Sequence, residues 1–191
     1  MMTPISQRTI LSLCDYSGSW SKPYREAGYN VVQVDIKHGQ DVRLFDYPGR
    51  VWGILAAPPC THLASSGARW WAEKGEAALL ESLAIADACL RFVALCSPKW
   101  WALENPVGRL AKYYGKPQFT FNPCDFGDPY TKKTNLWGNF TPPLPVFVGR
   151  QMGVEPVEGS KMHRLPPSAD RATLRSITPA GFAEAFFTAN R

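Results

Sequence analysis

A cysteine that follows two prolines is the residue of this sequence best placed to act as a nucleophile. Residues 51–57 are apolar and have the length of a buried strand. Pro58 and Pro59 then fix two φ angles and remove two backbone donors, so the strand must stop there. Cys60 would be held at the carboxyl end of the strand, where open α/β sheets bind their ligands. A thiol in that place is a candidate nucleophile, although an isolated cysteine is more often a small buried residue.

A carboxyl group follows a second apolar segment. Residues 100–103 predict another strand, which we expect Glu104, Asn105 and Pro106 to terminate. Glu104 would lie at the carboxyl end of this strand and could share a crevice with Cys60. Such a carboxyl is usually solvated, but in a partly dry pocket it holds its proton more strongly and can donate it.

The start of the chain has the pattern of a nucleotide-binding βαβ unit. Residues 9–14 and 30–36 predict strands, with a helix between them and a turn that contains Gly18. Asp35 closes the second strand, where an acid can accept hydrogen bonds from ribose hydroxyls. Many α/β proteins have such a unit for packing alone. Asp41 is either a surface turn residue or a second contact to the ligand.

The remaining pattern completes an α/β domain without internal repeats. Apolar residues at helical spacing predict a long amphipathic helix over 74–97 that covers one face of the sheet. Arg69 and Trp70, with Trp71, suit stacking on a nucleic-acid base, and they suit equally well a lid packed on the core. We also predict helices at 21–27 with Ser21 as N-cap and at 110–114, strands at 118–122 and 132–140, irregular structure over 141–177, and a helix at 179–189 with Thr178 as N-cap.

Composition sets broad limits on the kind of protein. The chain has 191 residues, 45% of them hydrophobic, which is enough for one sizeable domain. A net charge of +5 is compatible with a polyanionic partner and is also ordinary. Five cysteines without a CxxC pair favour reduced thiols in the cytoplasm, and Cys60 with His62 lacks further ligands nearby for a metal. We expect no signal peptide and no membrane span.

Taken together, these segments resemble the DNA cytosine-5 methyltransferases. Residues 13–29 (LCDYSGSWSKPYREAGY) line up with the family's first motif, D-x-F-x-G-x-G…S…AG-F. Pro58-Pro59-Cys60 with Gly67 is similar to P-P-C-Q-x-F-S-x-x-G, and Glu104-Asn105 with Pro106 looks like the E-N-V motif. Residues 125–132 (DFGDPYTK) resemble D-Y-G-x-P-Q-x-R. The resemblance covers most of residues 9–138.

The resemblance implies a fold, a reaction and a set of site residues. The fold would be the Rossmann-like class I S-adenosylmethionine-dependent methyltransferase fold, as a single domain over 1–191. The reaction would be transfer of a methyl group from S-adenosyl-L-methionine to C5 of cytosine in DNA, with Cys60 as nucleophile and Glu104 holding the base. The expected cofactor-binding residues are Asp15, Ser17, Gly18, Asp35, Ile36, Asp41 and Pro58. The expected substrate-binding residues are Pro59, Asn105, Arg69, Trp70, Lys132 and Lys133.

Several departures from the family pattern keep other readings open. Ser12 and Tyr16 replace an aspartate and a glycine of the first motif, Ala64 replaces a loop serine, and Lys132 and Thr134 stand at two arginine positions. Only about forty residues separate Lys133 from the last helix, where the family has a much larger target-recognition domain.

The small size resembles a phage or mobile-element version of the family. The substrate could then be a free cytidine nucleotide or an RNA base, the transferred group could differ from methyl, or the chain could be a degenerate relative that only binds nucleic acid or cofactor. An amino-group methyltransferase is disfavoured, because it would need Asp, Asn or Ser where Ala57 stands.

Overall fold

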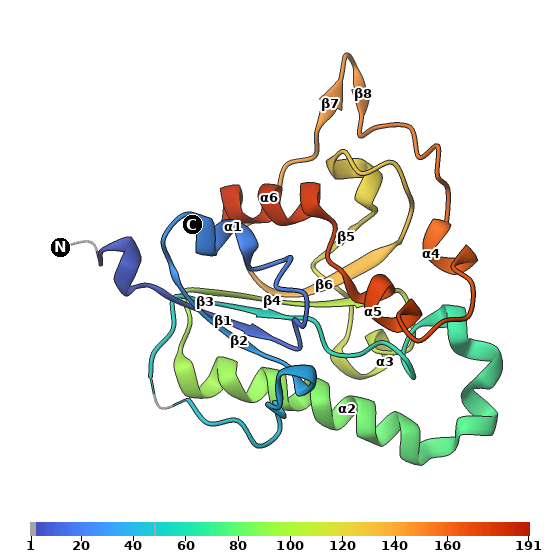
Figure 1. Cartoon of the computed structure of the whole chain (residues 1–191), viewed down its shortest axis with the longest axis horizontal. Coiled ribbons are helices and arrows are strands. Elements are labelled where there is room, and N and C mark those ends of the chain that lie inside the picture. The colour runs from blue at the N-terminus through green and yellow to red at the C-terminus, as the bar shows by residue number, and fades with distance from the viewer. Residues whose placement is uncertain (1–2, 48) are drawn as a thin grey trace.

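The computed structural model describes residues 3–47 and 49–191, and a six-stranded sheet lies at its centre (Figure 1). The first four strands of the order pair in parallel, and the last two are each antiparallel to their neighbour. The predicted Rossmann-like α/β class, a mostly parallel sheet with helices on both faces, is confirmed. In spatial order the strands are β2 (Asn30–Val34), β1 (Thr9–Leu13), β3 (Gly53–Ala56), β4 (Trp100–Pro106), β6 (Thr134–Asn139) and β5 (Phe119–Phe121).

Alternate residues of the strands pack into two separate hydrophobic cores, because successive side chains of a strand point to opposite faces. Leu11, Ile54 and Leu103 pack in the cluster to which α2 (Trp71–Cys96) contributes its buried side. Ile10, Leu55 and Ala102 pack on the other face, against α1 (Lys22–Glu26) and α6 (Ala180–Ala189). Figure 1 shows α2 on one side of the sheet and the other two helices on the opposite side.

The chain reverses its direction of travel across the sheet between β1 and β3. It passes from β1 to β2 on one side and returns to place β3 on the other side. The registers Leu13↔Ala56 and Ala56↔Leu103 end the parallel pairing of the three central strands at one level. The carboxyl ends of these strands therefore meet at a topological switch point, the usual ligand site of such sheets.

Three local predictions differ from the structure. β4 continues through Pro106, because Glu104 and its two successors pair with β6 after the pairing with β3 has ended. Ser21 precedes α1, but its hydroxyl contacts Asp15 and not the helix. Thr178 does not cap α6; the N–H of Gly181 instead donates to the Asp128 carboxylate at 3.1 Å.

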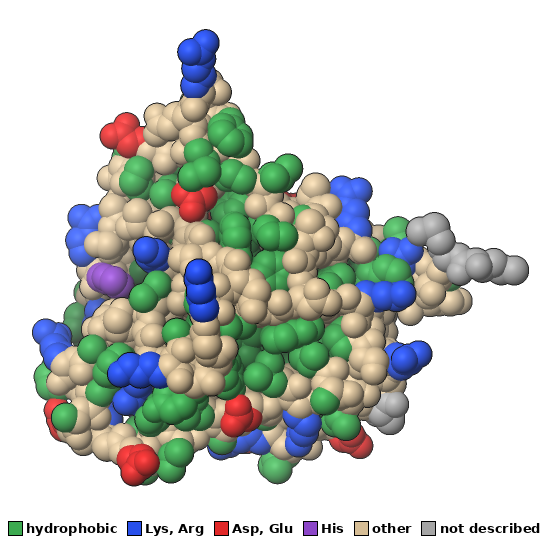
Figure 2. Space-filling view, turned by 180° about the vertical axis from the view of Figure 1, so that it is seen from behind, with side chains coloured by type: hydrophobic (Ala, Val, Ile, Leu, Met, Phe, Trp, Pro, Cys, Tyr) green, Lys and Arg blue, Asp and Glu red, His purple; other side chains and the backbone are tan. Residues whose placement is uncertain are grey.

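The segment predicted as irregular contains short elements. They are a hairpin of β7 (Phe147–Val148) and β8 (Gln151–Met152), then α4 (Lys161–Arg164) and α5 (Arg171–Ser176). The hairpin projects from the body, with exposed hydrophobic side chains along it and a basic one at its tip (Figures 1 and 2). Gly149, with φ of 63°, makes the tight turn and was the overlooked signal.

The long helix α2 is interrupted near its start, and the elements not yet named are short. Gly75 has a non-helical backbone conformation inside α2, with φ of 73° and ψ of −174°. The continuous part of the helix that was predicted over 74–97 therefore begins after Gly75. None of the helices among the described residues is both long and apolar enough to span a membrane. The remaining elements are α3 (Ala111–Tyr114) and the 3-10 turns Ile5–Gln7, Ile36–His38, Ser65–Trp70 and Pro123–Phe126.

Candidate active site

The loop that carries Cys60 is tightly folded and fixed to its neighbour. The Cys60 carbonyl accepts hydrogen bonds from the N–H groups of Leu63 (3.0 Å) and Ala64 (2.9 Å). Arg109, which follows β4, donates from Nε to the His62 carbonyl at 2.7 Å. A bridge between Ala64 and Gly108 closes the contact. The elbow predicted from the two prolines is therefore held in place by the chain that follows Glu104.

Glycine is required at position 108 for this close approach. A Cβ added to Gly108 would lie 2.0 Å from the Leu63 carbonyl oxygen and 2.8 Å from the Ala64 Cα. No side chain fits at such distances without moving backbone. A Cβ added to Gly67 in the same loop would lie 3.8 Å from its nearest atom, the Thr61 carbonyl oxygen, which is an ordinary contact. The requirement for glycine therefore applies to position 108 and not to position 67.

Glu104 is a buried carboxylate paired with a lysine. Its exposure is 8%, and the Lys132 Nζ lies 3.6 Å from its Oε1. The same Nζ donates a hydrogen bond of 2.9 Å to the carbonyl of Arg175 in α5. The alternation along β4 directs Glu104 to the face on which Ala102 and α6 lie. Lys132 thus bridges the end of β4 and a segment far along the chain.

The charges of Glu104, Lys132 and Arg175 affect the pKa of Cys60. Its thiol belongs to a free, partly exposed cysteine. Burial raises the pKa of the Cys60 thiol, and the Glu104 carboxylate raises it further, while Lys132 and Arg175 lower it. The predicted nucleophile therefore lies within electrostatic range of the predicted carboxyl and of two cations, one of which, Lys132, pairs with Glu104.

The turn after β1 is organised around a buried acid. The Asp15 carboxylate accepts hydrogen bonds from Ser12 Oγ (2.8 Å), Gly18 N (2.9 Å) and Ser21 Oγ (3.1 Å). Ser17 Oγ also lies 3.3 Å from it. Asp15 was predicted to bind cofactor, but its carboxylate is occupied in shaping the loop. Ser12, which replaces the family's aspartate, is one of its partners.

The end of β2 offers groups that suit a nucleoside. One carboxylate oxygen of Asp35 accepts from the Lys37 N–H at 2.8 Å, and no hydrogen bond among the described residues uses the other oxygen. Ile36 beside it is 67% exposed, which is unusual for an isoleucine. An acid that can accept ribose hydroxyls next to an uncovered apolar side chain fits the adenosine part of S-adenosylmethionine. Gly18, with φ of +66°, completes this edge.

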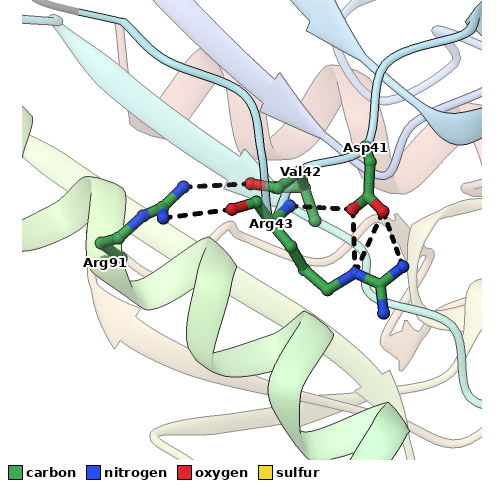
Figure 3. A network of polar contacts seen from close by, with 4 residues as sticks. All are labelled: Asp41, Val42, Arg43 and Arg91. Carbon is green, nitrogen blue, oxygen red and sulfur yellow. Dashed lines mark hydrogen bonds and ion pairs between the residues drawn. The ribbon is translucent and has the colours of Figure 1, made fainter.

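Asp41 serves a turn in this structure (Figure 3). Arg43 donates to its carboxylate from the backbone N–H at 2.9 Å and from the guanidinium at 2.6 to 3.1 Å. These hydrogen bonds lower the Asp41 pKa to about 2. Arg91 of α2 donates to the carbonyls of Val42 and Arg43, each at 3.2 Å, and so anchors the turn. Of the two readings of Asp41, the turn residue is the one that these contacts support.

The predicted substrate-binding residues have different fates. Asn105 is fully buried and donates from Nδ2 to the Pro58 carbonyl at 2.9 Å, so its side chain ties two strand ends together, while its Oδ1 has no partner among the described residues. Pro58, expected at the cofactor, is buried too, whereas Pro59 and Lys133 are exposed. The Arg69 guanidinium lies 5.0 Å from the ring centre of Trp70, which is half exposed.

Sequence reasoning gave no role to α5. This short helix lies beyond the carboxyl ends of the central strands (Figure 1). Thr173 Oγ1 accepts from the Lys37 ammonium next to the nucleoside edge, while the Arg175 guanidinium donates to Ser66 Oγ at 3.2 Å. α5 therefore touches both halves of the site. The only signal in the sequence was a scatter of basic residues, which does not indicate position.

Comparisons with known proteins add little to this geometry. No protein-family model matches the sequence, and the search of curated proteins found no match. One solved structure of similar fold is from E. coli and is described as a "putative DNA modification methyltransferase encoded within prophage". It is 16% identical with a TM-score of 0.49, and the match covers 69% of this chain and 46% of that one. The chain thus spans just under half of that protein's length, and a likeness at this level carries no functional argument.

The described residues contain no group of three or more His, Cys, Asp or Glu side chains that could hold a metal ion.

Proposed function

We propose that this chain transfers a methyl group from S-adenosyl-L-methionine to C5 of cytosine in DNA, with Cys60 and Glu104 acting on the base. The observation that supports the proposal is that a cysteine and a buried carboxyl follow two neighbouring, parallel-paired strand ends. β3 and β4 pair up to Ala56 and Leu103, and the charge of Glu104 raises the pKa of Cys60. The resemblance to the cytosine-5 methyltransferases supplies the reaction that uses such a pair.

The chemistry explains why these two residue types are needed. C5 of cytosine is a poor nucleophile until a thiolate adds to C6 and converts the ring to an enamine. Cys60 would form this C6–S bond and give up its proton. Glu104 would donate a hydrogen bond or a proton at N3, which takes up the electron density that addition pushes into the ring. C5 of the enamine would then accept the methyl group that bound S-adenosylmethionine would supply, with S-adenosylhomocysteine as the leaving group. Transfer of the C5 proton to a base, return of the N3 proton to Glu104 and cleavage of the C6–S bond would restore the aromatic base and release Cys60 as a thiolate.

The protonation states of Cys60 and Glu104 are coupled in the direction that the reaction needs. In the free protein a charged Glu104 raises the pKa of the Cys60 thiol. A proton on Glu104 removes that effect, so Cys60 loses its proton more readily when Glu104 holds one. Thiolate and protonated carboxyl are the forms that addition requires. Lys132 and Arg175 favour the thiolate in both states.

Asp35, Ile36 and Gly18 would hold the cofactor at the ends of β1 and β2. When bound there, S-adenosylmethionine supplies an electrophilic methyl group. The Asp35 carboxylate would accept hydrogen bonds from the ribose hydroxyls, and Ile36 would cover one face of the adenine. The Asp15 network would act indirectly, by fixing the turn that contains Gly18.

The experiment is an incubation with labelled S-adenosylmethionine and four substrates in parallel: duplex DNA, single-stranded DNA, RNA and dCMP. A base in a duplex cannot enter such a site unless it is flipped out, so the four rates also identify the substrate. Mass spectrometry of the digested product should find the new group on C5 of cytosine. Cys60→Ala should abolish transfer while calorimetry still detects cofactor binding. Label on another atom or another base would refute the proposal.

A further inference from the structure

A basic hollow of about 390 Å³ lies beside the Cys60 loop. Its size falls in the roughly 300–1,000 Å³ range of small-molecule sites. Three different parts of the chain form it: the turn after Cys60, α4 and α5. Figure 2 shows several Lys and Arg side chains on this edge of the molecule, at the left of that view. The lining residues are Ser65, Ser66, Arg69, His163, Arg171 and Arg175.

The cations of this hollow lack acidic partners. Among the ion pairs that residues 3–47 and 49–191 form, none includes a residue lining it. The Nε of Arg171 is buried and has no hydrogen-bond partner within the same residues. A buried donor without an acceptor is destabilising, and gathered guanidinium groups repel one another. Both conditions are relieved by an anion that accepts several hydrogen bonds.

A second basic hollow of about 370 Å³, at the opposite ends of the strands, differs in this respect. Arg8 lines it, but its Nε donates to the Thr3 carbonyl and its guanidinium stacks on Trp52 at 4.0 Å. Its leading cation is therefore engaged by protein groups, whereas in the hollow near Cys60 the buried Nε of Arg171 has no hydrogen-bond partner among the described residues and its Nη2 has only a long contact of 3.4 Å to the His163 carbonyl.

The hollow shares its walls with the candidate active site. Ser66 follows Cys60 by six residues and accepts a hydrogen bond from the Arg175 guanidinium. The carbonyl of the same Arg175 holds the Lys132 ammonium, which pairs with Glu104. A ligand whose base lies between Cys60 and Glu104 would therefore extend its sugar and phosphate toward these arginines.

We propose that this arginine hollow binds a phosphate group adjoining the cytosine that enters the Cys60–Glu104 site. Arg69, Arg171 and Arg175 provide charged, forked donors that match phosphate oxygens, and the Ser66 hydroxyl adds a neutral donor. The inference rests on the proposed function for the identity of the base, while phosphate recognition itself depends only on the hollow. The phosphate belongs either to a nucleic-acid strand or to a mononucleotide.

The test measures binding of a fluorescein-labelled single-stranded 12-mer by anisotropy between 50 and 200 mM salt. Arg171→Gln should weaken binding about tenfold and reduce the slope of log K against log salt by about 0.7, the value for one phosphate contact on a single strand. Arg191→Gln is the matched control, because Arg191 is exposed at the other end of the molecule, beside Phe187; it should change neither quantity. Arg69→Gln, on a different element, should repeat the effect and so guards against a folding defect in Arg171→Gln.

The outcomes separate this inference from the proposed function. An abasic 12-mer should show the same dependence on Arg171, whether or not methyl transfer occurs. Wild-type affinity and salt slope in both Arg171→Gln and Arg69→Gln would overturn the inference, even if cytosine is methylated. Competition by dCMP but not by cytidine identifies a mononucleotide phosphate, and failure of both to compete identifies a strand phosphate. Equal competition by cytidine and dCMP would also overturn it.

Discussion

Replacement of Lys132 by methionine should destabilise the fold by about 3–5 kcal/mol, the usual effect of removing one partner from a buried ion pair. The side chains of Lys132 and Glu104 are each only 10% exposed, with 3.6 Å between Nζ and Oε1. The change removes this pair and also the hydrogen bond of 2.9 Å to the Arg175 carbonyl. Methionine has nearly the length of lysine, so little packing is lost and the effect reports the charge.

A double-mutant cycle with Glu104→Gln isolates the pair. If the two charges interact as the structure places them, the double variant should be more stable than the sum of the single effects predicts, by about 2 kcal/mol. Urea unfolding at pH 8, followed by tryptophan fluorescence, gives all four free energies. Lys133→Met is the matched control: Lys133 is exposed, and its loss should change stability by less than about 0.5 kcal/mol.

A coupling below about 0.3 kcal/mol, or a loss under 1 kcal/mol in Lys132→Met, would refute this reasoning. Either result would mean that Lys132 and Glu104 do not form a buried pair, and that the electrostatic link to Cys60 has been misplaced.

Three other perturbations test separate parts of the site. Alkylation of Cys60 by iodoacetamide, followed by peptide mass spectrometry, should be slow at pH 7 and still accelerate above pH 9, because burial raises the pKa of the thiol. Glu104→Gln removes a charge that also raises this pKa, so the variant should react faster at pH 8. An unchanged rate would contradict the placement of Glu104 near Cys60. Gly108→Ala should destabilise the protein by about 1–3 kcal/mol in urea unfolding, whereas Gly67→Ala should be tolerated; equal effects would contradict the close approach at position 108. Asp35→Ala should weaken S-adenosylmethionine binding roughly tenfold to hundredfold in calorimetry, as expected for hydrogen bonds to a charged group, and unchanged affinity would mean that the ribose lies elsewhere.

Local sequence signals were sufficient for the central strands and for the residues at their ends. The prolines before Cys60 and the apolar run before Glu104 each mark a strand end within a few residues. In a parallel sheet such ends must gather at one edge. For that reason we could expect the chain segments that carry Cys60 and Glu104 to lie at the same edge before their strands were known to be neighbours.

Features that depend on contacts distant in sequence could not be predicted in this way. The extension of β4 depends on pairing with β6, and Arg175 reaches the site only because α5 folds back over it. The burial of Asn105 could not be predicted, because a motif gives residue types but no burial. Asp15 shows the same limit, since only coordinates reveal that its carboxylate is already occupied.

The central claim is that Cys60 forms a bond to the cytosine that is modified. The most direct test uses a substrate in which 5-fluorocytosine replaces the target base, incubated with S-adenosylmethionine. Fluorine cannot leave C5 as the proton does, so the bond to the enzyme should persist through denaturation. We predict a nucleotide adduct on the peptide that contains Cys60, and none in Cys60→Ala. An adduct on another residue, or methylation of ordinary cytosine by Cys60→Ala, would contradict the account.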